Sequence, residues 1–267
     1  MTAQKELLHY RLYQESPNQE WLVFIHGAGG SIVSWEYQIE AFRPFFQLLL
    51  LDLRDHGKSK NIAPAYDNYD FEIVANDILK VIDHLKIQKA HFMSLSLGSV
   101  ILQKLEDKKP ELIDKMIMAG GVFKANFKMK FFVHSAKFLN YFLHYRLLYD
   151  LFSIIVLPRK NHAHSRKLCR LESQILTRKE YLKWIGLYKD FFRLVRDFFQ
   201  RELESFSLVV MGDQDHVFFR AAQKFVAHHN SKAELAIFEK CGHVCNIEQY
   251  ERFNQTALAF LLNHPNK

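Results

Sequence analysis

Short apolar runs alternate with amphipathic segments along most of this chain, and that alternation constrains its fold more than any other feature. Six runs are apolar on both faces, as is typical of buried strands in a parallel sheet: 22–26, 48–53, 91–95, 115–119, 208–211 and 235–238. Four segments between or after them predict helices, the first with apolar residues close to a 3.6-residue period: 70–85, 99–105, 220–228 and 246–262. This order predicts an α/β fold with a doubly wound, mostly parallel β-sheet.

The alternation stops between residues 122 and 200. This stretch is aromatic, basic and permissive for helix, with few Gly or Pro residues and no strand pattern. We therefore predict a helical insertion over 122–200, set into a core that is formed by 1–121 and 201–267. The segment 5–14 predicts an antiparallel hairpin arm ahead of the first core strand.

Composition excludes several other classes of protein. Of the 267 residues, 49% are hydrophobic, which is enough for a large core and argues against disorder. The first ten residues lack a signal-peptide pattern, and the most apolar stretch, 138–157, is interrupted by polar and charged residues that argue against a membrane-spanning helix. The three cysteines are an odd and low count, which predicts a reducing, cytoplasmic location without a disulfide framework.

A serine with small neighbours lies directly between the third predicted strand and the helix that follows it. The motif reads Ser94-Leu95-Ser96-Leu97-Gly98, a G-x-S-x-G pattern with serine in place of its first glycine. A sharp strand–turn–helix elbow projects a nucleophile above the sheet, at a helix N-terminus that stabilises negative charge. The alternative is that Ser96 only caps the helix. We take Ser96 as the candidate nucleophile.

A glycine-rich loop follows the first predicted core strand, at His26-Gly27-Ala28-Gly29-Gly30-Ser31. Acyl transfer needs two backbone N–H groups that are aimed at the developing oxyanion. We assign these donors to Ala28 in this loop and to Leu97 beside the candidate nucleophile. The alternatives are an ordinary loop or a phosphate-binding loop, but the G-x-G-x-x-G spacing and a following Lys-Ser/Thr pair are absent, which argues against nucleotide binding.

Two further polar groups follow the last two predicted strands. Asp213 and Asp215 come after the strand at 208–211, and His243 comes after the strand at 235–238. A carboxylate at the end of a strand can orient a catalytic histidine, and we choose Asp215, with Asp213 as the second choice. The alternative is a polar turn, since Gly and Asp are common turn residues.

Cys241 and Cys245 flank His243, which raises the question of a zinc site. A structural zinc ion needs four ligands in tetrahedral arrangement, and the sequence has no second cluster of ligands with metal spacing. We therefore expect no metal at this position.

Ser96, Asp215 and His243 occur in the chain order of the α/β-hydrolase triad, each after its own predicted strand. The stretch from Asp52 to Ser59 also resembles the superfamily's D-x-R-G-H-G-x-S loop, and Trp35 matches an aromatic that is often found after the H-G loop. The chain thus resembles the α/β-hydrolase superfamily over nearly its whole length. It departs from the family pattern where Ser94 and Asp55 replace glycines.

The resemblance implies a serine hydrolase of carboxylic esters or thioesters that needs no cofactor. His243 would accept the Ser96 proton, and Asp215 would hold the histidine tautomer and stabilise its cation. The expected substrate-binding residues are His26, Gly27, Trp35 and Phe123. A serine nucleophile argues against the haloalkane dehalogenase and epoxide hydrolase branches, which need a carboxylate.

Two alternatives use the same fold. One is a C–C hydrolase or lyase with the same triad, similar to the menaquinone-pathway cyclohexadiene carboxylate synthase, whose family favours an Arg-rich pocket for a polyanionic substrate. The other is a non-hydrolytic ligand receptor. The fold alone does not choose among these activities.

In this superfamily the segment after the fourth core strand usually forms a lid over the triad, and here that segment is 122–200. It carries 17 aromatic residues, whose inner faces are expected to form an apolar acyl pocket or to pack lid against core. It also holds 16 Lys/Arg and 5 Asp/Glu, a net charge of +11, against −4 for the rest of the chain.

We expect the outer face of this segment to be basic, and three interpretations of that face remain open. It is a solvated face, or a surface for an acyl carrier protein or coenzyme A thioester, or a contact with an anionic membrane through 138–157. Nucleic acid is not expected as a partner, because no recognised nucleic-acid module accompanies the basic residues.

Overall fold

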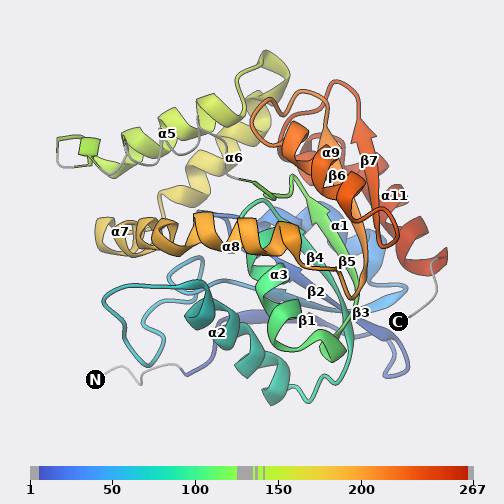
Figure 1. Ribbon diagram of the computed structural model, residues 1–267. Helices are drawn as coiled ribbons and strands as arrows, with labels where there is room; N and C mark the ends of the chain where they lie inside the picture. Colours follow the sequence, from blue (N-terminus) through green and yellow to red (C-terminus); the bar gives the residue numbers. More distant parts are fainter. Residues whose placement is uncertain (1–5, 125–134, 136–137, 141, 264–267) are drawn as a thin grey trace.

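A seven-stranded sheet forms the centre of the protein (Figure 1), whose computed structural model describes residues 6–124, 135, 138–140 and 142–263. In these residues the strands lie in the order β1-β3-β2-β4-β5-β6-β7. Their bounds are Tyr10–Tyr13, Glu20–Ile25, Phe46–Leu51, Ala90–Leu95, Ile113–Ala119, Phe206–Gly212 and Ala233–Phe238 for β1 to β7.

Strands β2 to β7 all run parallel to one another, which confirms the predicted fold class. In register, Ile25 at the end of β2 lies beside Leu51 of β3 and Ser94 of β4, so the carboxyl ends of these strands meet at one edge. The predicted hairpin arm is only partly right. Strand β1 is antiparallel, but it pairs with β3 at the sheet's edge and not with the strand that follows it in the chain.

Helices cover both faces of the sheet. On one face α1 packs against α11, and on the other α2 packs against α3 (Figure 1), while α9 lies against β6 and β7. The helix α2 begins where the Asp70 side chain accepts a hydrogen bond from the Ile73 amide at 2.7 Å. Helix bounds are Glu36–Phe42 (α1), Phe71–His84 (α2), Gly98–Lys108 (α3), Phe219–His228 (α9), Cys245–Glu248 (α10) and Tyr250–Asn263 (α11), with short 3₁₀ turns at Ile32–Trp35 and Pro110–Leu112.

Two helix predictions differ from the structure. The segment 246–262 is two helices, because the chain leaves helical geometry at Gln249, between α10 and α11. The helix α1 was not predicted. It is only seven residues long and begins directly after a 3₁₀ turn, without a side-chain cap on its first turn.

The chain between β5 and β6 is helical in the described residues, as predicted. The helices are α5 (Tyr145–Val156), α6 (Ala163–Ser173), α7 (Arg178–Gly186) and α8 (Tyr188–Gln200), with a 3₁₀ turn at Lys160–His162. The division into a core (1–121, 201–267) and an insertion (122–200) stays a prediction, and several of the insertion's aromatic and basic residues lie outside the described part: Phe127, Lys128, Lys130, Phe131, Phe132, Lys137 and Tyr141. None of the described helices is both long enough and apolar enough to cross a bilayer.

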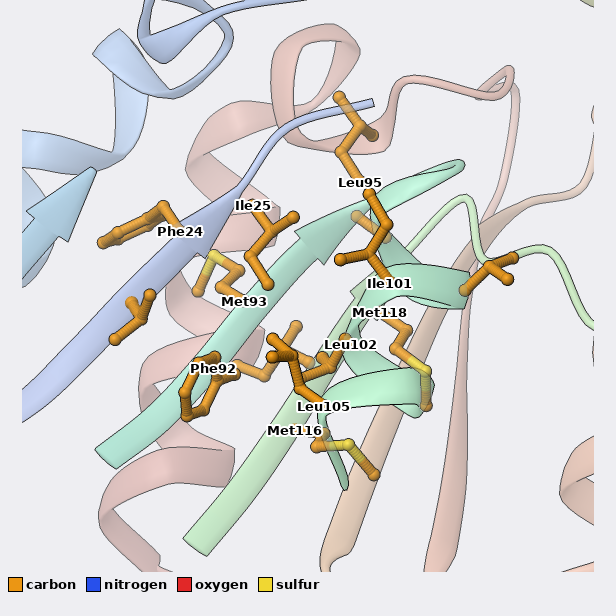
Figure 2. Close-up of a cluster of buried hydrophobic side chains, with 14 of the residues drawn as sticks. Phe24, Ile25, Phe92, Met93, Leu95, Ile101, Leu102, Leu105, Met116 and Met118 are labelled. Carbon is orange, nitrogen blue, oxygen red and sulfur yellow. The ribbon is translucent and has the colours of Figure 1, made fainter. Parts of the chain in front are cut away.

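The core beneath the turn that joins β4 to α3 is built from β2, β4, β5 and α3. Figure 2 shows Phe92 and Met93 of β4 in a buried cluster with side chains of the neighbouring strands and with Leu102 and Leu105 of α3. These four side chains are fully buried. Each such side chain contributes roughly 1.5–3 kcal/mol to folding. The turn between β4 and α3 therefore stands on a rigid base.

Candidate active site

The turn after β4 carries Ser96, and the structure brings it together with the two other predicted catalytic side chains. The Ser96 Oγ lies 2.8 Å from His243 Nε2, and His243 Nδ1 lies 2.7 Å from Asp215 Oδ2. With a neutral imidazole, Nδ1–H donates to the carboxylate, which leaves Nε2 free to accept the serine proton. This arrangement fits a nucleophile, a general base and an orienting acid.

The Ser96 turn is strained and tightly packed. Ser96 has a φ of +51°, in the left-handed region, and its amide donates to the Ala119 carbonyl at 2.9 Å. A Cβ on Gly98 would come within 2.6 Å of the Ile25 carbonyl oxygen, so only glycine fits there. The cap alternative is wrong: the N-cap of α3 is Leu97, and the Ser96 hydroxyl bonds to His243.

Ser94 takes the place of the first glycine of the elbow pattern without disturbing it. The residue is fully buried in β4, and its hydroxyl donates to the Ile117 carbonyl on β5 at 3.2 Å. A buried hydroxyl that finds a partner avoids the cost of an unsatisfied polar group. The departure from the pattern is therefore accommodated within the sheet.

Asp215 is fully buried at the end of β6 and is held on both carboxylate oxygens. Its Oδ1 accepts from the backbone amides of Val217 and Phe218, at 3.2 and 2.9 Å, and its Oδ2 faces His243. Such bonds stabilise a buried carboxylate and fix its direction. Asp213, the second choice, instead accepts from the Cys241 amide and shapes the loop before the histidine.

Cys241 and Cys245 are buried free thiols. The hydrogen bond with Cys245, and burial, raise the pKa of the Cys241 thiol, so it stays protonated. Both ring nitrogens of His243 are already engaged by Asp215 and Ser96. A zinc ion bound to His243 would have to displace one of these two hydrogen bonds.

Among the described residues, Glu20, His91 and Asp114 form a group whose ligand atoms lie within 4.8 Å of one another. They lie at the amino ends of β2, β4 and β5, whereas Ser96 follows the carboxyl end of β4. The Lys89 ammonium already pairs with Asp114 at 2.8 Å. A cation in this group would have to displace an existing positive charge.

Ala28 and Leu97, the predicted oxyanion donors, both line the cavity around Ser96. The Ala28 carbonyl accepts from the Tyr149 hydroxyl of α5 at 2.6 Å, and the next amide, of Gly29, donates to His56 Nε2 at 3.0 Å. The loop is thus anchored from two sides. The role of the two amides as oxyanion donors stays a prediction.

His26 and His56 form a buried pair beneath this loop, with ring centroids 5.1 Å apart. His26 Nε2 accepts from the Leu53 amide at 2.9 Å, so its Nδ1–H donates to the Gly27 carbonyl. His56 accepts from Gly29, and its Nδ1–H donates to the Arg54 carbonyl at 3.0 Å. Burial lowers the pKa of both histidines, so both are neutral. Their hydrogen bonds hold the glycine-rich loop in place.

Three of the four predicted substrate-binding residues are absent from the described cavity wall. His26 holds the glycine-rich loop, Trp35 packs edge-on against Phe24 at 5.2 Å, and Phe123 stacks on Phe225 at 4.0 Å. All three predicted residues are essentially inaccessible. We therefore correct their assignment: these side chains lie behind the cavity wall and support it. Gly27 does line the cavity, as predicted.

The cavity itself has a volume of about 100 Å³ and is mostly apolar. Its walls come from the glycine-rich loop, from the Ser96 turn and from helices α5, α6 and α8. The insertion contributes Tyr149, Phe152, Ser153, Val156, Leu157, Leu168, Cys169, Glu172 and Phe191. These helices therefore cover Ser96.

Glu172 is the functional candidate that sequence reasoning missed most clearly. It is the one Asp or Glu in the described cavity wall, which contains no Lys or Arg. Ser31 donates a hydrogen bond to its carboxyl group, and burial raises the pKa of Glu172. The only sequence signal is its place on a helix face near Leu168 and Cys169, one turn away.

The loop that resembles D-x-R-G-H-G-x-S fixes the surroundings of the site. Asp52 accepts from the Ile32 and Lys58 amides at 2.8 and 2.9 Å. Arg54 makes two bonds of 2.6 Å to Asp77 in the protein interior. These paired groups have positioning roles and are set back from the nucleophile.

Known proteins resemble this chain across most of its length. A family model described as alpha/beta hydrolase fold matches residues 20–250. A curated Haemophilus influenzae protein with the provisional name esterase/lipase is 31% identical over 116 residues, which are 43% of this chain and 39% of that protein. The 2-hydroxy-6-oxononadienedioate/2-hydroxy-6-oxononatrienedioate hydrolase of Escherichia coli is 25% identical over 255 residues, which are 91% of this chain and 87% of the relative.

In the first two curated relatives the matched stretch spans less than half of the relative's length. Among solved structures, a hydrolase from Pseudomonas aeruginosa matches with a TM-score of 0.77 and 21% identity, over 95% of this chain and 93% of that one. The structural match shows the fold, and the family model shows the membership. The chain belongs to the alpha/beta hydrolase family.

Proposed function

We propose that this enzyme hydrolyses carboxylic esters or thioesters through an acyl-enzyme on Ser96. The observation that carries the proposal is the continuous hydrogen-bonded chain from Ser96 through His243 to buried Asp215. His243 takes the hydroxyl proton as the serine oxygen attacks the carbonyl carbon, and then gives it to the leaving alcohol or thiol. A water molecule, deprotonated by the same histidine, then releases the acid and regenerates the serine.

The oxyanion that forms at each attack would be bound by the amides of Ala28 and Leu97. Both residues border the cavity beside the nucleophile. Preorganised donors of this kind are each worth roughly 2.7–4 kcal/mol of barrier. The anchors from Tyr149 and His56 to the Ala28–Gly29 stretch support such preorganisation.

The cavity wall favours an uncharged acyl group over a polyanionic substrate. Apolar side chains dominate it, and in the described wall the carboxyl group of Glu172 has no Lys or Arg beside it to attract a substrate carboxylate. A substrate carboxylate here would be poorly solvated and would find no cationic partner in the described wall. The described basic residues of the insertion are absent from this wall, which weighs against the lyase-like alternative with an Arg-rich pocket.

The test begins with Ser96→Ala against p-nitrophenyl butyrate, with Ser231→Ala as a matched control at an exposed turn. We expect Ser96→Ala to lose essentially all turnover while keeping its thermal unfolding transition, and the control to keep both. A fluorophosphonate should add one covalent adduct to Ser96, as measured by mass spectrometry. Undiminished turnover in Ser96→Ala would refute the assignment.

Substrate preference separates the ester proposal from its alternatives. We expect p-nitrophenyl esters of short and medium chains to outperform palmitate, because the cavity is small, and butyrate to outperform the succinate half-ester. Glu172→Gln should narrow the gap between butyrate and succinate, whereas exposed Glu202→Gln should leave it unchanged. A wild-type preference for the succinate half-ester would favour the polyanion-binding alternative, and silence toward all esters would favour a lyase or receptor.

A further inference from the structure

The helix α5 has an apolar face that points away from the protein. Leu147, Leu151, Ile154 and Ile155 follow one another at helical spacing, and Leu143 lies just before the helix begins. These five side chains, here called the α5 outer face, are between 37% and 58% exposed. A contiguous row of large aliphatic side chains exposed to water usually marks a surface that binds a partner or a membrane.

Basic residues border the α5 outer face. Arg146 lies at the start of the helix, Arg159 and Lys160 lie just past its end, and Lys167 lies on the neighbouring helix α6; all four are exposed. We call these four residues the basic border. The sequence predicted a basic outer face for the whole insertion, and on α5 that face is apolar with a basic border.

The acidic residues of this region are engaged elsewhere. Asp150 on α5 pairs with Arg170 on α6 at 2.9 Å, and Glu172 lies in the cavity wall with its bond from Ser31. The surface around the α5 outer face therefore keeps a positive excess in the described residues. Its partner should be apolar in the middle and negative around it.

We propose that the α5 outer face and its basic border dock the enzyme onto the surface of an anionic phospholipid bilayer. A peripheral helix of this kind places its apolar side at the boundary of the acyl chains and its cations among the headgroups. A second copy of the chain would cover the apolar row but bring two basic borders together. An acidic carrier protein would match the border but leave five aliphatic side chains without an apolar partner.

The opposite face of α5 faces the catalytic cavity. Tyr149, Phe152 and Val156 line that cavity, on the other side of the helix from Leu147 and Leu151. A docked enzyme would hold its cavity one helix diameter from the bilayer, about 10 Å. The substrate class that follows, esters that dissolve in membranes, rests on the proposed function, but the docking does not.

The first test is flotation of the full chain with phosphatidylcholine vesicles, with and without phosphatidylglycerol. We expect binding to the anionic vesicles that weakens as salt rises, because headgroup attraction is screened. The double variant Leu147→Ser/Leu151→Ser should lower the partition coefficient about tenfold or more. Leu262→Ser, a matched change at an exposed leucine of α11, should leave it unchanged.

The basic border is tested separately from the apolar face. Lys160→Gln/Lys167→Gln should weaken binding to anionic vesicles several-fold and flatten its salt dependence. The matched pair Lys80→Gln/Lys224→Gln, at exposed positions of α2 and α9, should do neither. Equal losses in both pairs would indicate attraction by overall charge and would overturn the proposed border.

Hydrolytic activity and oligomeric state are measured on the same variants. The leucine variant should keep wild-type kcat/KM on p-nitrophenyl butyrate in solution, and Ser96→Ala should bind vesicles like the wild type. Failure of docking and failure of hydrolysis are therefore distinguishable. No binding to anionic vesicles at low salt would overturn the proposal. So would a dimer in solution that Leu147→Ser/Leu151→Ser dissociates, or binding to an acidic carrier protein without binding to vesicles.

Discussion

His56 is a buried residue outside the catalytic trio, and its replacement by phenylalanine tests how the glycine-rich loop is held. A phenylalanine ring keeps the flat shape that packs edge-on against Trp184, whose ring centroid lies 4.5 Å away. It loses the acceptor for the buried Gly29 amide and the donor to the Arg54 carbonyl, which still accepts from Trp184. One orphaned amide costs about 1–3 kcal/mol and the second bond about 1 kcal/mol, so we expect a loss of roughly 2–4 kcal/mol.

The same substitution should change how stability depends on pH. Burial lowers the pKa of His56 well below its ordinary value of 6.5, and the pKa of buried His26 is lowered too. Above the unfolded-state pKa of histidine, these two residues therefore do not reduce the free energy of unfolding. Below it, the unfolded chain binds protons that the folded chain refuses, so each histidine lowers stability by up to about 1.4 kcal/mol per pH unit until its folded-state pKa is reached.

The assay is urea denaturation at pH 8.0 and at successive steps down to pH 5.0, for the wild type, His56→Phe and His84→Phe. His84 is exposed at the end of α2, so that control should stay within about 0.5 kcal/mol of the wild type. We expect His56→Phe to be less stable at pH 8.0 but to lose less on acidification. A stability at pH 8.0 equal to that of the wild type, or an unchanged slope with pH, would refute the reasoning.

Three further changes test the site and its supports. Asp215→Asn should lower kcat on p-nitrophenyl butyrate by about 10⁴-fold, because the imidazole then takes the wrong tautomer, and a loss under tenfold would contradict the role of this carboxylate. Gly98→Ala should lower both melting temperature and kcat, since its Cβ would lie 2.6 Å from a β2 carbonyl, whereas Gly186→Ala, with 3.8 Å to its nearest neighbour, should lower neither. Asp77→Ala should cost about 3–5 kcal/mol in urea denaturation by leaving buried Arg54 without its partner, and a loss under 1 kcal/mol would show that water or another group replaces it.

The sheet could be predicted from the sequence because its signals are local. A strand that is buried on both faces is an uninterrupted apolar run, and the six predicted runs correspond to β2 to β7. Parallel strands place their carboxyl ends at one edge, so polar residues after strands could be grouped without knowing any distance. The partner of β1 could not be predicted, because strand order depends on contacts between distant segments.

The cavity wall could not be predicted in the same way. His26, Trp35 and Phe123 lie near the motifs in sequence, but their side chains point into the protein interior. Glycine-rich loops show where the backbone turns and leave open which way the neighbouring side chains point. Tyr149 and Glu172 enter the wall from the insertion, whose placement over Ser96 is a tertiary contact without a local signal.

One departure from the family pattern is itself informative, because Asp55 lies where this chain contacts its own insertion. Asp55 stands where the pattern has glycine and keeps the left-handed backbone, with a φ of +64°. Unlike glycine, it offers a carboxylate, which accepts a hydrogen bond from Tyr69. Tyr69 in turn lies edge-on to Trp184 of α7 and accepts from Lys183 at 3.3 Å. The residue that weakens the motif therefore joins the loop after β3 to the helices over the site, a link that glycine could not make.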